Sequence, residues 1–191
     1  NFRFERNLIK RLEVLTALIL SGLTFKEYEE NYNIGIKDLE KFVKSNFDED
    51  GFPLSRNPND LIFFTKYLLL CHESINDAQK YMPEFLDDII KKNLSCIKSL
   101  KTPDDQTPLF NGSSDNNLNN FEKYLEKVKE NKKDKKNIIG GIFCAKSKQQ
   151  ILYFDTGGPP GKNFSNNYQS GPLSFEYFLD GIKIITNCGF G

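Results

Sequence analysis

The chain has 191 residues, and its 26 Lys and Arg residues balance its 26 Asp and Glu residues, so the formal net charge at pH 7 is zero. Without net charge there is no global field that attracts nucleic acid, and no nucleic-acid partner is expected. No apolar run reaches the roughly 18 residues that a membrane-spanning helix needs, so no membrane span is predicted.

The N-terminal part of the sequence carries apolar residues at helical spacing. Residues 4–23 repeat Leu and Ile every three or four positions and predict a first helix. Residues 24–35 predict a short helix or loop that closes at Asn33–Gly35, and a further amphipathic helix then ends near Asn46. Residues 48–60 are dense in turn-forming residues and predict a loop.

Three further helices are predicted after this loop. One starts at Asn57-Pro58, because proline is well tolerated in the first helical turn. A second runs from Pro83 to Leu100 and has a wide apolar face. A polar loop with two prolines and a glycine separates it from a final helix over Asn117–Val128. The lysine-rich residues 131–137 then predict a solvated linker.

From residue 138 onward the apolar period changes from helical spacing to two. Ile142–Ala145 and Ile151–Phe154 predict a hairpin, and residues 173–178 predict a strand with two distinct faces. Asp180-Gly181 predicts a two-residue turn into a return strand, because both turn positions need positive φ. Helices followed by strands indicate an α+β fold. We assign residues 1–130 to a helical domain, 131–137 to a linker and 138–191 to a β-domain.

The four cysteines do not form a metal-binding pattern. They lie far apart in the sequence, without a Cys-x-x-Cys step, and His72 is the single histidine. We interpret the thiols as small buried hydrophobic groups and His72 as a histidine near a helix end. Neither a metal site nor a cofactor is predicted.

One motif frame near the C-terminus resembles a known family. Gln169-Ser170-Gly171-Pro172-Leu173-Ser174-Phe175-Glu176 leads into the Asp-Gly turn, and Asn187-Cys188-Gly189 closes the frame. This pattern resembles the β-domain signature of heparinase II/III-like proteins, a group of polysaccharide lyases. In that signature a histidine step stands where this chain has Gln169.

Two further segments resemble the same family. Asp50 to Pro58 is similar to a family loop in which Asp-Gly-Gly-His precedes Ser-Arg-Ser-Pro, with Pro53 where the histidine would be. Leu109-Phe110-Asn111-Gly112 is similar to the family's Leu-Phe-Asn step. The resemblance implies an incomplete (α/α) toroid of helical hairpins followed by the first strands of an antiparallel β-sandwich. It also implies an acidic polysaccharide or oligosaccharide as partner, in the periplasm or cell envelope.

The chemistry implied by the resemblance is β-elimination in a uronic-acid glycan. A base removes the proton at C5 while the oxygen at C4 leaves, and the site stabilises the developing enolate. Arg56 and Asn111 would hold the uronate carboxylate, and Gln169 would position the sugar by hydrogen bonds. Neutral Gln169 cannot act as the base, so the base would be Tyr168, if ionised, or a group outside these residues; an unshifted tyrosine has a pKa of about 10.

Each candidate residue also has a structural interpretation. Arg56 ties down its own loop or caps a helix, and Asn111-Gly112 is a common turn pair. Glu176, included among the substrate-binding candidates, is either a solvent-facing strand residue or a buried partner of Arg56, and we favour the second.

Two functions remain open at this point. One is a polysaccharide lyase, and the alternative is a catalytically silent relative that binds glycan or serves the cell envelope, because histidine is missing at both positions. The chain starts without Met and stops directly after a predicted strand. We therefore expect it to be part of a longer protein and not to fold stably alone.

Overall fold

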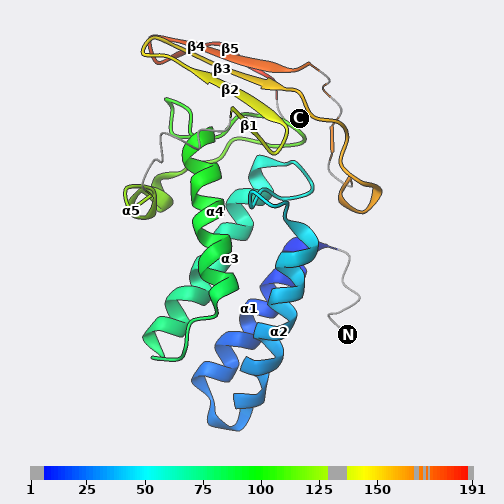
Figure 1. Ribbon diagram of the computed structural model, residues 1–191, viewed down its shortest axis with the longest axis vertical. Coiled ribbons are helices and arrows are strands. Elements are labelled where there is room, and N and C mark those ends of the chain that lie inside the picture. Colours follow the sequence, from blue (N-terminus) through cyan, green and yellow to red (C-terminus); the bar gives the residue numbers. More distant parts are fainter. Residues whose placement is uncertain (1–6, 129–136, 166–167, 170, 172, 189–191) are drawn as a thin grey trace. The chain divides into compact units, whose positions relative to one another are not determined.

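A computed structural model describes residues 7–128, 137–165, 168–169, 171 and 173–188 (Figure 1). The chain divides into two compact units, which we call unit 1 (Asn1–Phe47 and Ile62–Lys91) and unit 2 (Asp48–Leu61 and Lys92–Gly191). The α+β class is confirmed, since helices come first and a five-stranded antiparallel sheet follows. The domain boundaries inferred from the sequence stay a prediction, and all but the last residue of linker 131–137 lies outside the described residues.

Unit 1 begins with a helical hairpin. Helix α1 spans Leu8–Thr24 and helix α2 spans Glu29–Asn46, and a single 3-10 turn, η2 (Lys26–Tyr28), joins them. The helix break expected at Asn33–Gly35 is wrong, because Gly35 lies inside α2. A Cβ on Gly35 would lie 2.6 Å from the Ile19 side chain, so this glycine lets the two helices approach closely instead of ending one.

Two long helices follow, α3 over Pro58–Asp77 and α4 over Glu84–Leu100. The predicted start of α3 is confirmed, because the Asn57 side chain accepts the backbone N–H of Asn59 at 2.8 Å and Pro58 is the first helical residue. His72, near the end of α3, lies 3.0 Å from the Asp87 carboxylate. None of the described helices is both long and apolar enough to cross a membrane.

The core of unit 1 is formed by apolar side chains of α1, α2 and α3. Leu12, Leu15 and Ile19 of α1 and Leu39 and Phe42 of α2 are fully buried. The Phe64 ring of α3 packs edge-on against the Phe42 ring, with 5.5 Å between centroids. Burial of these side chains against each other is the main source of stability for such helices.

Unit 2 contains long loops next to short helices. The helix expected over Asn117–Val128 is wrong in extent, because only η3 (Asn119–Phe121) and α5 (Glu122–Leu125) are helical. The Asn117 side chain accepts the backbone N–H of Asn119 at 2.7 Å. Such local bonds compete with helix formation in asparagine-rich segments.

The sheet of unit 2 has the strand order β1-β2-β3-β4-β5, and all neighbours are antiparallel. The strands are β1 (Ile138–Ile139), β2 (Ile142–Lys146), β3 (Gln150–Asp155), β4 (Phe175–Leu179) and β5 (Ile182–Ile185). The predicted turn between β4 and β5 is confirmed, because Asp180 and Gly181 have φ values of 49° and 81°.

One face of this sheet is buried, and it carries two carboxylates. Asp155 at the end of β3 is 4% exposed, and Glu176 in β4 is fully buried. Tyr153 and Phe178 lie on the same face and are also buried. A buried carboxylate requires a cation or several hydrogen-bond donors close by, so each one marks a point where the sheet holds another segment.

Candidate functional site

Arg56 occupies the loop that precedes α3, and its guanidinium group is surrounded by acceptors. It forms an ion pair with Asp155, and it donates to the carbonyl oxygens of Gly140 at 3.0 Å, Gly158 at 2.5 Å and Gly141 at 3.4 Å. Its side chain is only 12% exposed. The structure therefore shows the loop-anchoring role for Arg56, and carboxylate binding by this residue stays a prediction.

Glycines make room for the Arg56 guanidinium. A Cβ on Gly141 would lie 2.7 Å from Nη2 of Arg56, and a Cβ on Gly157 would overlap the same group. A Cβ on Gly158 would meet no atom within 4 Å. The guanidinium fits against the backbone here because Gly141 and Gly157 carry no side chain.

Asn111 is held by the same loop. Its Nδ2 donates to the backbone carbonyl of Arg56 at 3.0 Å, and the residue is 4% exposed. Among the described residues, Oδ1 of Asn111 has no hydrogen-bond partner. Asn111 and Gly112 have φ values of 57° and 85°, so the turn interpretation is confirmed. The turn places a buried amide with one oxygen and one N–H still available.

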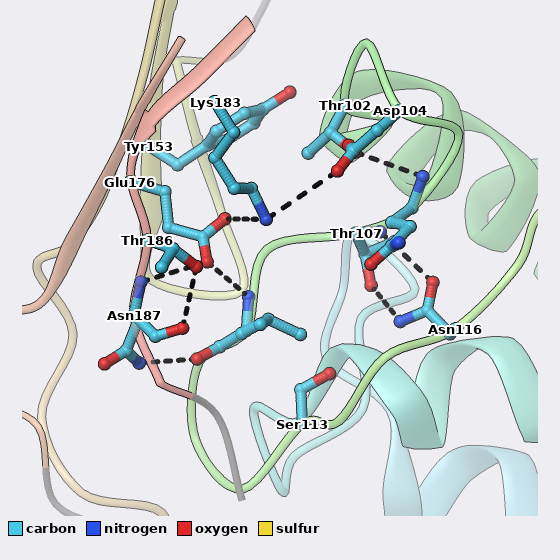
Figure 2. A network of polar contacts seen from close by, with 12 residues as sticks. Thr102, Asp104, Thr107, Ser113, Asn116, Tyr153, Glu176, Lys183, Thr186 and Asn187 are labelled. Carbon is cyan, nitrogen blue, oxygen red and sulfur yellow. Dashed lines mark hydrogen bonds and ion pairs between the residues drawn. The ribbon is translucent and has the colours of Figure 1, made fainter.

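The Glu176 carboxylate connects the sheet to the segment before Asn111 (Figure 2). Its Oε1 accepts the backbone N–H groups of Leu109 and Asn187, each at 3.3 Å. The side chain of Asn187 donates to the Leu109 carbonyl at 2.5 Å. Leu109 thus has both its backbone polar groups bound by residues of the β4–β5 hairpin and the segment after it.

The cation that pairs with Glu176 is Lys183 of β5. Its ammonium lies 3.4 Å from Oε2 of Glu176 and 3.9 Å from the Asp104 carboxylate. Glu176 is therefore buried as expected, but the expected pairing with Arg56 is wrong, because Arg56 pairs with Asp155 instead. Desolvation raises the pKa of Glu176 above its ordinary value, and Lys183 and the two backbone N–H donors oppose this rise.

An asparagine-rich cluster fixes the other side of the segment. Oδ1 of Asn59 accepts from the Ser113 hydroxyl at 3.0 Å and from Asn116 at 2.8 Å. Asn116 in turn bonds the backbone N–H and the hydroxyl of Thr107, a pair that Figure 2 shows. This cluster was missed at the sequence level, although the polar run after Asn111 is the signal that could have revealed it.

Tyr168 and Gln169 lie in the segment between β3 and β4. Tyr168 is half-buried and Gln169 is exposed. Within the described part of the chain, neither side chain makes a hydrogen bond or ion pair with Arg56, Asn111 or Glu176. The structure thus connects three of the five candidate residues. Asn111 bonds the Arg56 carbonyl, and Glu176 bonds the backbone of Leu109, two positions before Asn111. Tyr168 and Gln169 are not connected to these three through the residues that the structure describes. No group of metal ligands is found among the described residues.

Comparison with known proteins gives similarity at the level of structure. No protein-family model and no curated protein matches the chain. The solved crystal structure of heparinase III superposes with a TM-score of 0.79 over 97% of this chain, at 16% identity. The chain has the heparinase III fold. The heparinase III-BT4657 gene product (TM-score 0.78) and heparan sulfate lyase HepC from Pedobacter heparinus (0.73) each match 94% of the chain at 18% identity.

The heparinase III fold is present here in part. The chain spans about a third of the length of these solved structures, 35% of heparinase III and 32% of the other two. The family resemblance read from the motif frames is therefore confirmed as a likeness of fold. Within this fold, the frames at Asp50–Pro58 and Leu109–Gly112 meet at the bond between Asn111 and Arg56.

Proposed function

We propose that this protein is a polysaccharide lyase that cleaves a uronic-acid glycan by β-elimination. The observation that carries the proposal is the match of nearly the whole chain to heparinase III and to a heparan sulfate lyase. It is supported by a buried amide, Asn111, that keeps an N–H and an oxygen free of partners among the described residues. A uronate carboxylate or its enolate would be the acceptor for that N–H.

The proposed roles differ between the two residues of the helical part. Asn111 would donate a hydrogen bond to the uronate carboxylate, because an oriented amide N–H costs no reorganisation when charge develops. Arg56 already shares its charge with Asp155, so a substrate carboxylate would have to compete for it. We therefore assign Arg56 to loop anchoring first and to carboxylate binding only where a substrate displaces one of the backbone carbonyl oxygens from its guanidinium.

The roles proposed for Tyr168 and Gln169 are the same as those inferred from the sequence. Gln169 is exposed and would position the sugar by hydrogen bonds, and half-buried Tyr168 would act as the base. Only the ionised phenolate of this residue could remove the proton. The alternative is that a residue from another part of the full protein acts as the base.

The test is turnover of defined glycans. The intact protein is incubated with heparan sulfate and other uronic-acid glycans, and the unsaturated product is followed by ultraviolet absorbance. Asn111→Ala is expected to lower kcat by about a hundredfold or more, as loss of one oriented donor does. The matched control is Asn120→Ala, an exposed asparagine of η3 in the same unit. Equal activity of both variants would contradict the role of Asn111.

A catalytically silent glycan-binding protein is the second candidate. It is favoured by Pro53 and Gln169, which stand where the resembling family has histidines and which cannot remove a proton. Calorimetric binding of the same glycans without any gain in absorbance would support this candidate. Turnover that disappears in Tyr168→Phe would exclude it.

We also propose that the protein works in the periplasm or cell envelope, as the resemblance implies for an enzyme of external glycans. Fractionation of cells that express the full gene is the test. Recovery of the protein in the cytosolic fraction alone would contradict this location.

A further inference from the structure

The segment that ends at Asn111 is tied to the sheet by one carboxylate. Oε1 of Glu176 accepts two backbone N–H groups, one from Leu109 and one from Asn187, while Oε2 faces the Lys183 ammonium. These partners come from two places in the sequence: Leu109 lies in the loop after α4, and Lys183 and Asn187 lie within and just after β5. A fully buried side chain with this set of partners has one favoured orientation, because any other would leave its charge unpaired.

We propose that Glu176 is a positioning residue that acts on Asn111 through Leu109. This rests on the proposed function, in which Asn111 touches the uronate. Leu109 stands two residues before Asn111, and the residue between them, Phe110, is 1% exposed and fixed by packing. Asn111 is then fixed a second time, by its own bond to the Arg56 carbonyl.

The two attachments have different origins. Glu176 of β4 sets where the chain enters the Asn111 turn, and Asp155 of β3, through Arg56, sets the acceptor that orients the Asn111 amide. Both carboxylates lie on the buried face of one sheet. A small error in the placement of a substrate-binding group is costly in rate, so the stiffness of this arrangement has a catalytic consequence.

Glu176→Ala and Glu176→Gln distinguish the hydrogen bonds to the backbone N–H groups from the charge pairing with Lys183. Alanine removes the single oxygen, Oε1, that accepts both N–H groups, whereas glutamine keeps an oxygen for them and places its amide nitrogen against Lys183. We expect Glu176→Ala to lower kcat by about a hundredfold with a smaller change in KM, because the transition state is affected more than substrate binding. Glutamine should restore a large part of kcat. Glu126→Ala, which removes an exposed carboxylate after α5, should leave kcat unchanged.

A double-mutant cycle distinguishes positioning from simple stabilisation. If Glu176 acts through Asn111, then Glu176→Ala in an Asn111→Ala background should change kcat by less than about twofold. Activities are compared per folded molecule, well below the melting temperature of each variant. A full additional loss of kcat in the Asn111→Ala background would overturn the proposal.

A second readout does not depend on catalysis. Hydrogen exchange of a peptide that contains Leu109 is measured in the intact wild type and in both Glu176 variants. Faster exchange in Glu176→Ala and near-normal exchange in Glu176→Gln are expected. Unchanged exchange in Glu176→Ala would overturn the proposal, whether or not the protein turns over a glycan.

Failure of the proposed function has a different signature. If the wild type binds a glycan without cleaving it, the same cycle is carried out on Kd, and a non-additive loss still supports positioning. If the wild type neither cleaves nor binds uronic-acid glycans, the proposed function fails. A positioning role toward substrate then fails with it, while the exchange data still report on the Leu109 attachment.

Discussion

Arg56 and Asp155 form an ion pair between residues that lie 99 positions apart in the sequence. The pair joins the loop before α3 to the end of β3, and both side chains are largely buried. The loop comes from the helical part of the sequence, yet it lies in the same compact unit as the sheet. The loop also carries the carbonyl that orients Asn111.

Removal of Arg56 should destabilise unit 2. Arg56→Ala leaves the Asp155 carboxylate buried without its cation, and such a loss costs about 3–5 kcal/mol of unfolding free energy. Arg56→Lys should recover only a part, because one ammonium cannot reach the four acceptors around the guanidinium. Chemical denaturation of the intact protein measures both. A loss below about 1 kcal/mol for alanine would show that the pair does not hold the loop.

Gly157 and Gly158 offer a matched pair of substitutions. Gly157→Ala places a methyl group against the Arg56 guanidinium, and we expect a loss of about 1–3 kcal/mol from overpacking. Gly158→Ala enters open space and should stay within about 0.5 kcal/mol of the wild type. Melting temperatures of the two variants, recorded side by side, are the measurement. Equal melting temperatures would mean that Gly157 is not part of the guanidinium site.

The buried Glu176 carboxyl predicts a definite sign of pH dependence. Burial raises its folded-state pKa above the ordinary value of 4.5, so the folded protein holds this proton more tightly than the unfolded chain does. The stability from this group is present below about pH 4.5 and is lost as the pH rises through the raised pKa. The difference in unfolding free energy between wild type and Glu176→Gln should therefore fall with rising pH. A difference that grows with pH would contradict a raised pKa.

Lys183 sets how far that pH range extends. Its ammonium is the largest influence that lowers the pKa of Glu176 against the desolvation. Lys183→Met should raise this pKa further and extend the loss of stability to higher pH. The pH profile of unfolding for Lys183→Met, compared with that for Lys127→Met as an exposed control, tests this. Superimposable profiles would mean that the charge of Lys183 does not reach Glu176.

Features set by local chemistry could be predicted from the sequence. The Asp180-Gly181 turn, the start of α3 at Pro58 and the order of helices before strands all follow from backbone preferences and apolar spacing. The continuous α2 could not be predicted, because a glycine such as Gly35 commonly marks the end of a helix. Its role depends on contact with Ile19, a residue of another helix, which local patterns do not report.

The candidate site could be predicted only in part. Arg56, Asn111 and Glu176 were found from motif frames, but their partners Asp155 and Lys183 were not. The alternation of residues along β4 reveals that the strand has two faces. It does not tell which face is buried or which cation will lie opposite Glu176. The Arg56–Asp155 pair forms between segments that are far apart in the sequence, so neither segment alone contains the information. Lys183 lies in the same hairpin as Glu176, but their pairing depends on which face of that hairpin becomes buried.

The discontinuous composition of unit 2 also constrains the order in which it forms. The loop of residues 48–57 is synthesised well before residues 140–158, which carry all the acceptors that the Arg56 guanidinium binds in the folded protein. Contacts between such distant positions form slowly, because the entropy of a long loop must be lost before the contact can stabilise the closed chain. We therefore expect this loop to become ordered late, together with the sheet. In pulse-labelled refolding, the amides of Arg56 and Cys144 should acquire protection in the same phase.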